Sequence, residues 1–423
     1  MRFVKHSVAA VVWMCAAGCG GGVDVDPGAP EQCVPGRQVS CACLGGDVGV
    51  QQCLSDDTFG RCVCPGDTGA TGGVPASSSS GTGGFGGDGG FGGGGGFGGS
   101  TASELTELDI EARHVIADPV RGVFYATVGG DAAAHANSVV VVDAASARVL
   151  DSVLVGSQPL TMALSDDGSS LWVSLQGSYE IRRVDLTSGS PVPAEQYPLP
   201  RGEWGDLAYA GPMVVLPGTT GSVALSLHRE DVSPSYAGSV VVDSGVARPD
   251  QTPGHTGASR LTGGPAGWVF GFNDLHTGFG FYSLRVTETG LASTEHEDLI
   301  PGFYTDIVYA DGRVYATSGE VVNVSNPSSP TRAGEFAFAG DAILPLAPEP
   351  RLLMLSADFG SPAVLRLLDT ETFAQIDEVT YPDLDIEEAF DLVSTDGESL
   401  AFIGSGGFDD PPRLFVLTNP FDG

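Results

Sequence analysis

Residues 105–423 alternate short apolar runs, rich in β-branched and aromatic residues, with turn-forming residues. In the first such unit the runs begin at His114, Val123, Ser138 and Arg148. Runs of this kind are typical of β-strands, and no stretch has the 3.6-residue periodicity of a long amphipathic helix. We therefore expect an all-β domain.

One turn position recurs seven times, with a mean spacing of about 46 residues. It is occupied by Asp118-Pro119, Asp167-Gly168, Gly211-Pro212, Gly264-Pro265, Asp311-Gly312, Glu349-Pro350 and Asp396-Gly397. Repeats of this length with four strands each are typical of a β-propeller, in which each blade buries its faces against its neighbours. The spacing predicts a seven-bladed β-propeller over residues 105–423.

The last repeat ends after three strands, whereas residues 105–110 alternate apolar and polar residues ahead of the first repeat. We expect this N-terminal segment to supply the missing outer strand and to close the ring, which removes an open sheet edge. Asp143, Asp185 and Asp369 each end a third strand before a Ser- or Thr-containing turn. Such carboxylates are expected to cap the backbone of the turn that follows.

Two groups of segments resemble known bacterial propeller repeats. Asp306-Ile-Val-Tyr-Ala-Asp-Gly-Arg-Val-Tyr-Ala, followed by Val322-Asn-Val-Ser-Asn-Pro-Ser-Ser-Pro-Thr-Arg, resembles the LVIVD repeat of surface propellers. Ser165-Asp-Asp-Gly-Ser-Ser-Leu-Trp-Val and Asp118-Pro-Val-Arg-Gly-Val-Phe-Tyr-Ala resemble YVTN-type propellers, whose relatives include lactonases. The resemblance implies the fold, but propellers host enzymes, scaffolds and adhesins alike.

The N-terminus has the pattern of an export signal over residues 1–18, with Arg2 and Lys5 ahead of an apolar run that is too short to span a membrane. The run ends in Ala16-Ala17-Gly18-Cys19, which resembles the lipobox of bacterial lipoproteins. That resemblance implies a lipid on Cys19, a tether over residues 19–32 and, because no Asp follows Cys19, sorting to the outer membrane. Ala16 departs from the usual Leu and leaves ordinary signal-peptidase cleavage as the alternative.

Six further cysteines, an even number, fall within residues 33–64: Cys33, Cys41, Cys43, Cys53, Cys62 and Cys64. In an exported chain this pattern predicts a small disulfide-bonded module of unassigned pairing. The alternative is a metal knuckle, because Cys41-Ala-Cys43 and Cys62-Val-Cys64 pair thiols, although zinc sites generally use longer spacers. Residues 65–104 are rich in Gly and Ser and predict a flexible linker.

The chain carries 53 Asp and Glu against 19 Lys and Arg, a net charge of −34. This balance argues against nucleic acid or an anionic membrane surface as a partner. The expected membrane association is through the N-terminal lipid alone.

Polar residues gather where the inner strand of each repeat is expected to begin, at the mouth of the propeller channel. They are His114, Thr161, Asp206, Arg260, Asp306, Asp341 and Asp391. If Asp206, Asp306 and Asp391 occupy equivalent positions, their carboxylates would face one another and suit Ca²⁺ or Mg²⁺. The alternative is structural, with these side chains bonded to the backbone between blades. Neighbouring loops add Asp131, His135, Asp250, His255, Asp274, His276, Asp358, Asp409 and Asp410.

No motif of a nucleophilic hydrolase, zinc protease or phosphate-binding loop occurs in residues 105–423. We therefore expect a lipid-anchored cell-envelope propeller that binds a protein or a glycan. The alternative is a divalent-cation-dependent hydrolase or lactonase-like enzyme, with its site at the channel and no cofactor other than a cation such as Ca²⁺.

The lipobox-like segment generates a direct prediction. Replacing Cys19 with Ser removes the thiol that would take the lipid, so the protein should move from the membrane fraction to the soluble fraction. Fractionation of cells followed by immunoblotting measures this. A Cys19→Ser variant that still sediments with membranes would contradict the lipoprotein interpretation.

Overall fold

The computed structural model describes residues 105–255, 257–407 and 410–421 in full, and the backbone of residues 38–42 and 48–52. Within these ranges the chain is all-β apart from one short 3-10 turn, η1 (Gln176–Ser178). No helix in them is long and apolar enough to cross a membrane. The predictions for the signal segment 1–18, for Cys19 and its tether, and for the linker 65–104 lie outside the described residues.

The cysteine-rich segment contains two short strands that pair antiparallel, β1 (Gln38–Ala42) and β2 (Val48–Gln52). The side chains of its six cysteines lie outside the described part of the chain, so their disulfide bonding stays a prediction.

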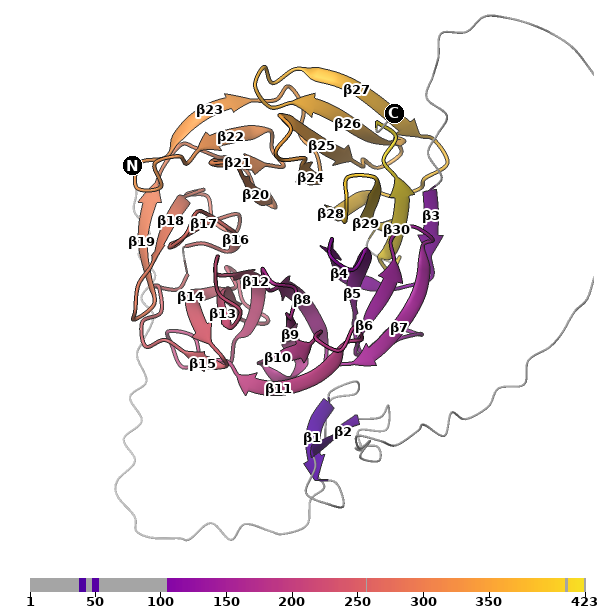
Figure 1. Cartoon of the computed structure of the whole chain (residues 1–423). Helices are drawn as coiled ribbons and strands as arrows, with labels where there is room; N and C mark the ends of the chain where they lie inside the picture. The colour runs from indigo at the N-terminus through magenta and orange to yellow at the C-terminus, as the bar shows by residue number, and fades with distance from the viewer. Residues whose placement is uncertain (1–37, 43–47, 53–104, 256, 408–409, 422–423) are drawn as a thin grey trace, which may run out of the picture.

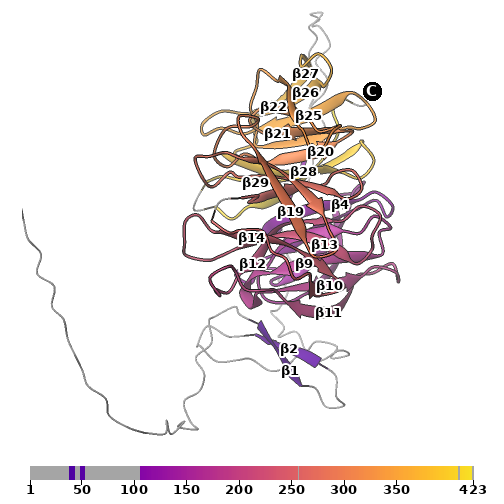
Figure 2. The same ribbon diagram turned by 90° about the vertical axis from the view of Figure 1, so that its left-hand side faces the viewer.

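Seven four-stranded antiparallel sheets are arranged in a ring around a central axis, which confirms the predicted seven-bladed β-propeller (Figure 1). Figure 2 views the same ring from its side. The first three blades consist of β4 (Ala112–Asp118), β5 (Val123–Val128), β6 (Ser138–Asp143) and β7 (Arg148–Leu154); of β8 (Pro159–Leu164), β9 (Ser170–Leu175), β10 (Glu180–Asp185) and β11 (Val192–Pro198); and of β12 (Tyr209–Val215), β13 (Ser222–His228), β14 (Tyr236–Asp243) and β15 (Val246–Ala247).

The next three blades continue in the same order, with the innermost strand first in the chain. They consist of β16 (Arg260–Thr262), β17 (Trp268–Phe272), β18 (Phe281–Val286) and β19 (Leu291–His296); of β20 (Ile307–Ala310), β21 (Arg313–Ala316), β22 (Glu320–Asn323) and β23 (Thr331–Glu335); and of β24 (Ala342–Pro345), β25 (Arg351–Ser356), β26 (Ala363–Asp369) and β27 (Gln375–Tyr381).

The seventh blade combines the two ends of the domain. It contains β28 (Glu388–Ser394), β29 (Ser399–Ser405) and β30 (Arg413–Thr418) from the C-terminal end, and β3 (Leu105–Leu108) as its outer strand. β3 runs antiparallel to β30, with Leu105 opposite Leu417 and Leu108 opposite Leu414. The predicted closure of the ring by the N-terminal strand is confirmed.

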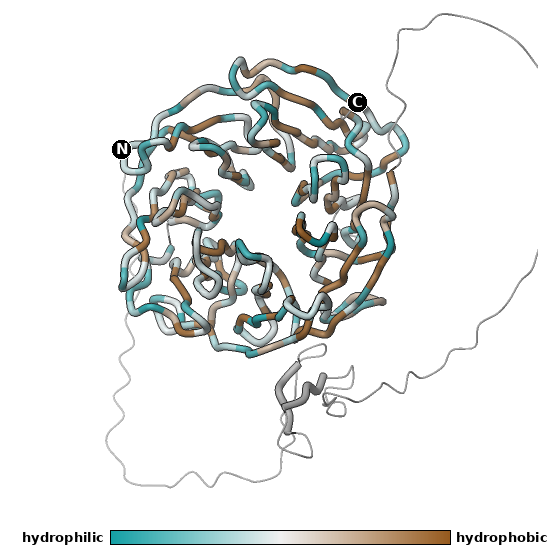
Figure 3. The backbone as a smooth tube through the Cα atoms, viewed as in Figure 1, coloured by the Kyte–Doolittle hydropathy of each residue, from teal (hydrophilic) through white to brown (hydrophobic). Residues whose placement is uncertain are grey.

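Burial follows the position of a strand within its blade. The second strand β5 is buried at every position, because neighbouring blades cover both of its faces, whereas the outer strand β7 is mostly exposed. The apolar side chains form seven clusters within the described residues, one at each boundary between adjacent blades. Figure 3 shows the corresponding hydrophobic stretches within the blades. The core is therefore a ring of interfaces between blades.

The turns between strands match the sequence prediction with one exception. Gly211-Pro212 was expected to form the first turn of the third blade, but it lies inside β12, where the register with β13 shifts between Ala210 and Met213. A bulge tolerates proline because its backbone needs no ladder hydrogen bond there. The turn itself spans residues 216–221, where the backbone N–H of Leu216 bonds to Ser222.

The predicted caps after the third strands are confirmed. Asp143 accepts a hydrogen bond from the backbone N–H of Ser146, and Asp185 accepts one from Thr187, each at 2.8 Å. Asp369 accepts the N–H groups of two successive residues in its turn, at 2.9 and 2.7 Å. The hydroxyl of Thr187, together with its backbone N–H, lowers the pKa of Asp185, and the hydrogen bonds of the turn lower the pKa of Asp369. The three residues fix the hairpins between the third and fourth strands, which lie on one face of the ring.

Candidate functional site

The ring has two faces, which we name by their loops. The upper face carries the connections between blades and the loops that join the second and third strands of each blade. The lower face carries the turns after the first strands and the hairpins capped by Asp143, Asp185 and Asp369. The predicted channel-mouth residues lie at or near the upper ends of the inner strands.

Two of these residues connect adjacent blades. Asp391 in β28 accepts a hydrogen bond from the backbone N–H of Val115 in β4, at 3.1 Å between Oδ2 and nitrogen. His114 in β4 likewise accepts the N–H of Met162 in β8 through Nδ1, at 3.2 Å. Nε2 of the same ring lies 3.9 Å from Asp391 Oδ2. Both side chains therefore hydrogen-bond to the backbone of a neighbouring blade.

Threonines make the same kind of connection elsewhere in the ring. Thr161 Oγ1 donates to the carbonyl oxygen of Gly211 in the next blade, at 2.5 Å. Thr262 Oγ1 accepts the backbone N–H of Tyr309 in the following blade, at 2.8 Å. Polar side chains on the inner strands thus hold consecutive blades together around the channel.

The carboxylates predicted to face one another do not occupy equivalent positions. Asp206 precedes β12 by three residues, is about half exposed, and pairs with Arg229 at 3.3 Å. Asp306 directly precedes β20, whereas Asp391 lies inside β28 at a register shift and has a positive φ of 54°. No group of three or more His, Cys, Asp or Glu arranged to hold a metal occurs in the described residues. The expected convergence of all three carboxylates is therefore not found.

An arginine of the chain itself lies among the carboxylates that remain. Arg260, at the start of β16, donates from Nε to Asp274 Oδ2 at 2.8 Å. Burial opposes its charge, but Asp306, Asp274 and Asp391 outweigh this effect and raise the pKa of the guanidinium. Burial also raises the pKa of Asp391; His114 and Arg260 act against this, and Asp306 adds to it. Arg260 thus adds a positive charge beside carboxylates that the sequence offered as possible cation ligands.

Burial and hydrogen bonds hold Asp274 in position to pair with Arg260. It is 1% exposed, and Ser259 Oγ donates to its Oδ1 at 2.6 Å. Its backbone N–H in turn donates to the same hydroxyl at 3.1 Å. Because Asp274 is buried, hydrogen-bonded and paired with Arg260, it fixes the guanidinium at the edge of the channel.

Asp341, the remaining predicted residue, lies apart from this group. It directly precedes β24 and accepts the backbone N–H of Ala357 at 2.6 Å. Burial raises the pKa of Asp341 to about 6, with further contributions from the negative charges of Asp358 and Glu388. Asp341 thus connects the start of the inner strand β24 to a loop of the same blade through this hydrogen bond.

A feature that the sequence analysis missed is a series of aromatic rings across the upper face, over the third to fifth blades. Its members, here called the aromatic arc, are Trp204, His255, His276, Phe279, Phe303 and Tyr304. Consecutive ring centroids lie 6.5 Å apart for Trp204–His255, 6.1 Å for His255–His276, 4.9 Å for Phe279–Phe303 and 6.5 Å for Phe303–Tyr304. The two halves join through one loop, in which the N–H of Phe279 donates to the carbonyl of His276.

The arc is accessible to solvent. Trp204 is 58% exposed, Phe303 50% and Tyr304 83%. The guanidinium of Arg229 lies 4.3 Å from the ring centroid of Trp204. All six residues come from loops between strands, and an exposed Trp beside charged residues, as in Glu203-Trp204, is the signal in the sequence that could have revealed them.

The comparison with solved structures supports the fold. No protein-family model matches the sequence and no curated protein matches it, so the resemblance to LVIVD and YVTN-type repeats stays a prediction. Solved structures do match. The β-propeller domain of Cps50 (Swd1) from Myceliophteria thermophila has a TM-score of 0.55 at 11% identity and covers 74% of this chain and 99% of its own.

Two further structures give the same result. U3-55K has a TM-score of 0.53 at 14% identity over 76% of this chain and 100% of its own. The WD40 repeats of RRP9 have a TM-score of 0.53 at 14% identity and cover 75% of this chain and 98% of their own. At these identities the matches show a shared β-propeller fold.

Asp341 generates a prediction about pH. Its pKa is about 6 in the folded protein, against ~4 in an unfolded chain, so the folded state holds this proton more tightly. The associated stabilisation is complete below about pH 4 and is lost as the pH rises to about 6. Asp341→Asn keeps an acceptor for Ala357 and removes the titration. The variant should therefore gain about 2–3 kcal/mol relative to wild type between pH 4 and pH 7.

Chemical denaturation of both proteins at several pH values measures this difference. Asp377→Asn, on the exposed strand β27, is the control and should follow wild type throughout. A difference between Asp341→Asn and wild type that does not vary with pH would contradict the assignment.

Proposed function

We propose that this protein is an exported, lipid-anchored scaffold that binds another protein on the upper face of its propeller. The aromatic arc is the observation that supports the proposal. Exposed aromatic side chains gathered on one face of a soluble domain are typical of interaction sites, and Trp, Tyr and Arg dominate the binding energy of protein interfaces. The WD40-like fold of the similar structures is consistent with a protein-binding scaffold.

The framework beneath the arc is suited to binding. The loops of the arc adjoin inner strands that polar side chains such as Thr262 connect to the next blade. Arg260 and the buried Asp274 fix the same region through an ion pair at 2.8 Å. Preformed surfaces lose less conformational entropy on association and therefore bind more tightly for a given contact area.

The geometry of the rings favours a protein over a glycan. Successive rings are inclined to one another by 58°, 59°, 79° and 50°, so they form an uneven surface without a shared plane. One face of Trp204 is covered by Arg229, which leaves less of the ring for stacking on a sugar. An uneven aromatic surface with charged residues around it matches the side chains of a protein partner.

The N-terminal segments complete the proposal. Cys19 carries the lipid anchor, residues 33–64 form a disulfide-bonded spacer, and the Gly-rich residues 65–104 extend the reach of the propeller. A flexible linker of this length has a root-mean-square span of about 35 Å. The propeller would then meet partners at a distance from the outer membrane while staying attached to it.

A site-specific photo-crosslinker tests the proposed face in cells that produce the protein. A benzophenone side chain at Tyr304 should give a discrete adduct with a second protein. The same group at Val120, which is 81% exposed in a turn of the lower face, is the positional control. Trp204→Ala in the Tyr304 background should reduce the adduct by up to roughly 30-fold, because a dominant Trp side chain contributes about 2 kcal/mol to a protein interface.

Absence of a protein adduct at Tyr304, or equal adducts at both positions, would contradict the proposal. An adduct that contains carbohydrate and no second polypeptide would assign the face to a glycan instead.

A further inference from the structure

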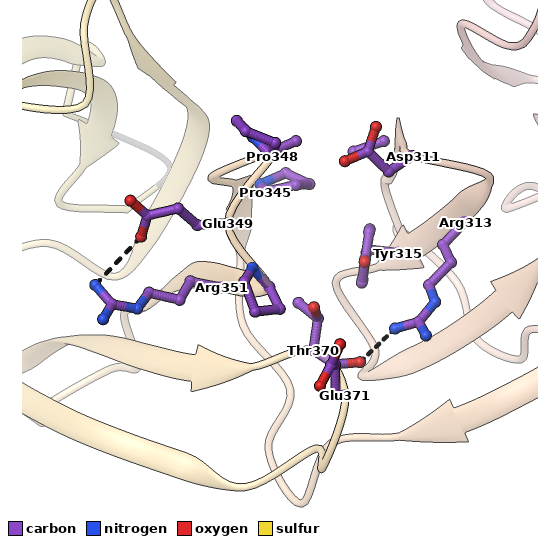
Figure 4. A pocket seen from close by; sticks show the side chains of 12 residues that line it. Asp311, Arg313, Tyr315, Pro345, Pro348, Glu349, Arg351, Thr370 and Glu371 are labelled. Atoms are coloured by element: carbon purple, nitrogen blue, oxygen red, sulfur yellow. Dashed lines mark hydrogen bonds and ion pairs between the residues drawn. The ribbon is translucent and has the colours of Figure 1, made fainter.

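The lower face carries a cavity that the proposed function does not use. It lies between the fifth and sixth blades, has a volume of about 210 Å³ and opens to solvent. Its walls come from the first turn of the fifth blade at Asp311, the first turn of the sixth blade at residues 346–350, and the hairpin that contains Thr370 and Glu371 (Figure 4). The upper-face arc contributes no residue to it.

The walls of this cavity combine charged and polar side chains with apolar surfaces. Pro345, Pro348 and Pro350 line one side, and the ring of Tyr315, which is 5% exposed, lines another. Proline rings and a buried aromatic ring offer flat apolar surfaces against which an alkyl chain can pack. The volume is below the roughly 300–1,000 Å³ of sites for drug-sized ligands, so it suits a single long side chain.

The charged residues of the cavity indicate the charge of the ligand that it binds. The two arginines of the cavity already have partners, since Arg351 pairs with Glu349 at 3.3 Å and Arg313 donates to the carbonyl oxygen of Thr370. The carboxylates of Asp311 and Glu371 have no ion-pair partner among the described residues. Figure 4 shows them on different sides of the cavity, with Tyr315 between them. Counted against Arg313 and Arg351, the carboxylates of Asp311, Glu349 and Glu371 leave the cavity with one net negative charge, which favours a cationic ligand.

We propose that this cavity binds the side chain of an arginine or lysine from a partner protein. The alkyl stem packs against the proline rings and Tyr315, and the cationic head meets the carboxylates of Asp311 and Glu371. The net charge of −34 attracts basic partners from a distance and favours the same sign of ligand.

A second cavity favours a protein over a free amine. It lies on the other side of the 346–350 turn, has a volume of about 390 Å³, and shares Pro345, Pro348 and Glu349 with the first. Asp396 of the seventh blade lines its far side. A polypeptide that places one basic side chain in the first cavity can continue across the turn into the second, whereas a short amine fills only one.

The test uses the full chain and small probes, because single side chains bind weakly. The probes are N-acetyl-arginine methylamide, its uncharged counterpart N-acetyl-norleucine methylamide, and spermidine as a free polyamine. Binding is followed by NMR chemical shifts in the protein. We expect the arginine probe to shift resonances of residues that line the cavity, and 0.5 M salt to weaken its binding. The norleucine probe should bind at least tenfold more weakly.

The variant Asp311→Asn with Glu371→Gln removes both carboxylates. Asn tolerates the left-handed backbone of Asp311, whose φ is 46°, so the fold is retained. Each exposed ion pair contributes up to ~1 kcal/mol, so the double variant should bind the arginine probe about tenfold more weakly. Glu288→Gln, an exposed carboxylate on the same face, is the matched control and should bind as wild type does.

Equal binding of the arginine and norleucine probes, or unchanged affinity in the double variant, would overturn the proposal. Binding of spermidine without binding of the arginine probe would overturn its assignment to a protein partner. Substitutions in the aromatic arc should leave these affinities unchanged, so failure of this site and failure of the upper-face proposal are separate results.

Discussion

The pairing of β3 with β30 is the interaction on which the rest of the ring depends. Each blade buries its faces against two neighbours, and the described core consists of seven such interfaces. The seventh blade has only three strands of its own, so residues from the start of the domain complete it. Ile110, 2% exposed, lies two residues after the end of β3 and packs in the interface between the seventh and first blades. Closure thus joins the two ends of the domain through backbone hydrogen bonds and apolar packing.

The charges at the channel depend on the same closure. Asp391 belongs to the seventh blade and accepts its hydrogen bond from Val115 in the first, across the closing interface. Burial raises the pKa of Asp391, Arg260 of the fourth blade acts against this rise, and Asp306 and Asp391 help to raise the pKa of Arg260. A ring held open at this interface would separate these groups. At the inner surface of the propeller, carboxylates from different blades therefore interact electrostatically with one arginine, Arg260.

The sequence predicted the ring well because the strands carry a strong local signal. Runs such as Ser138–Asp143 are apolar and β-branched, and their ends are marked by turn residues whose chemistry is local. The closing strand was predictable for the same reason. The seventh repeat contained only three strands, and residues 105–110 formed a strand that belonged to no other repeat. Gly211-Pro212 was misassigned because the same dipeptide suits a turn and a bulge, and only the pairing of β12 with β13 distinguishes them.

The site was less predictable because it depends on register and on long loops. The prediction that Asp391 and Asp306 are equivalent assumed that each directly precedes its inner strand. Asp391 instead lies within β28, at a register shift. The position of Arg260 among these carboxylates depends on contacts across the channel, which leave no local pattern. The aromatic arc is assembled from residues of separate loops, such as Trp204 and Tyr304, that tertiary packing alone brings to one face.

Thermal unfolding of two deletion variants tests the closure of the ring most directly. Deleting residues 101–111 removes β3 and Ile110, and the loss of about three buried or half-buried apolar side chains should lower Tm by about 10 °C or more. Deleting residues 66–100, which shortens the Gly-rich linker by a larger number of residues, should leave Tm within about 2 °C of the full chain. Equal Tm values for the two deletion variants would contradict a ring closed by its N-terminal strand.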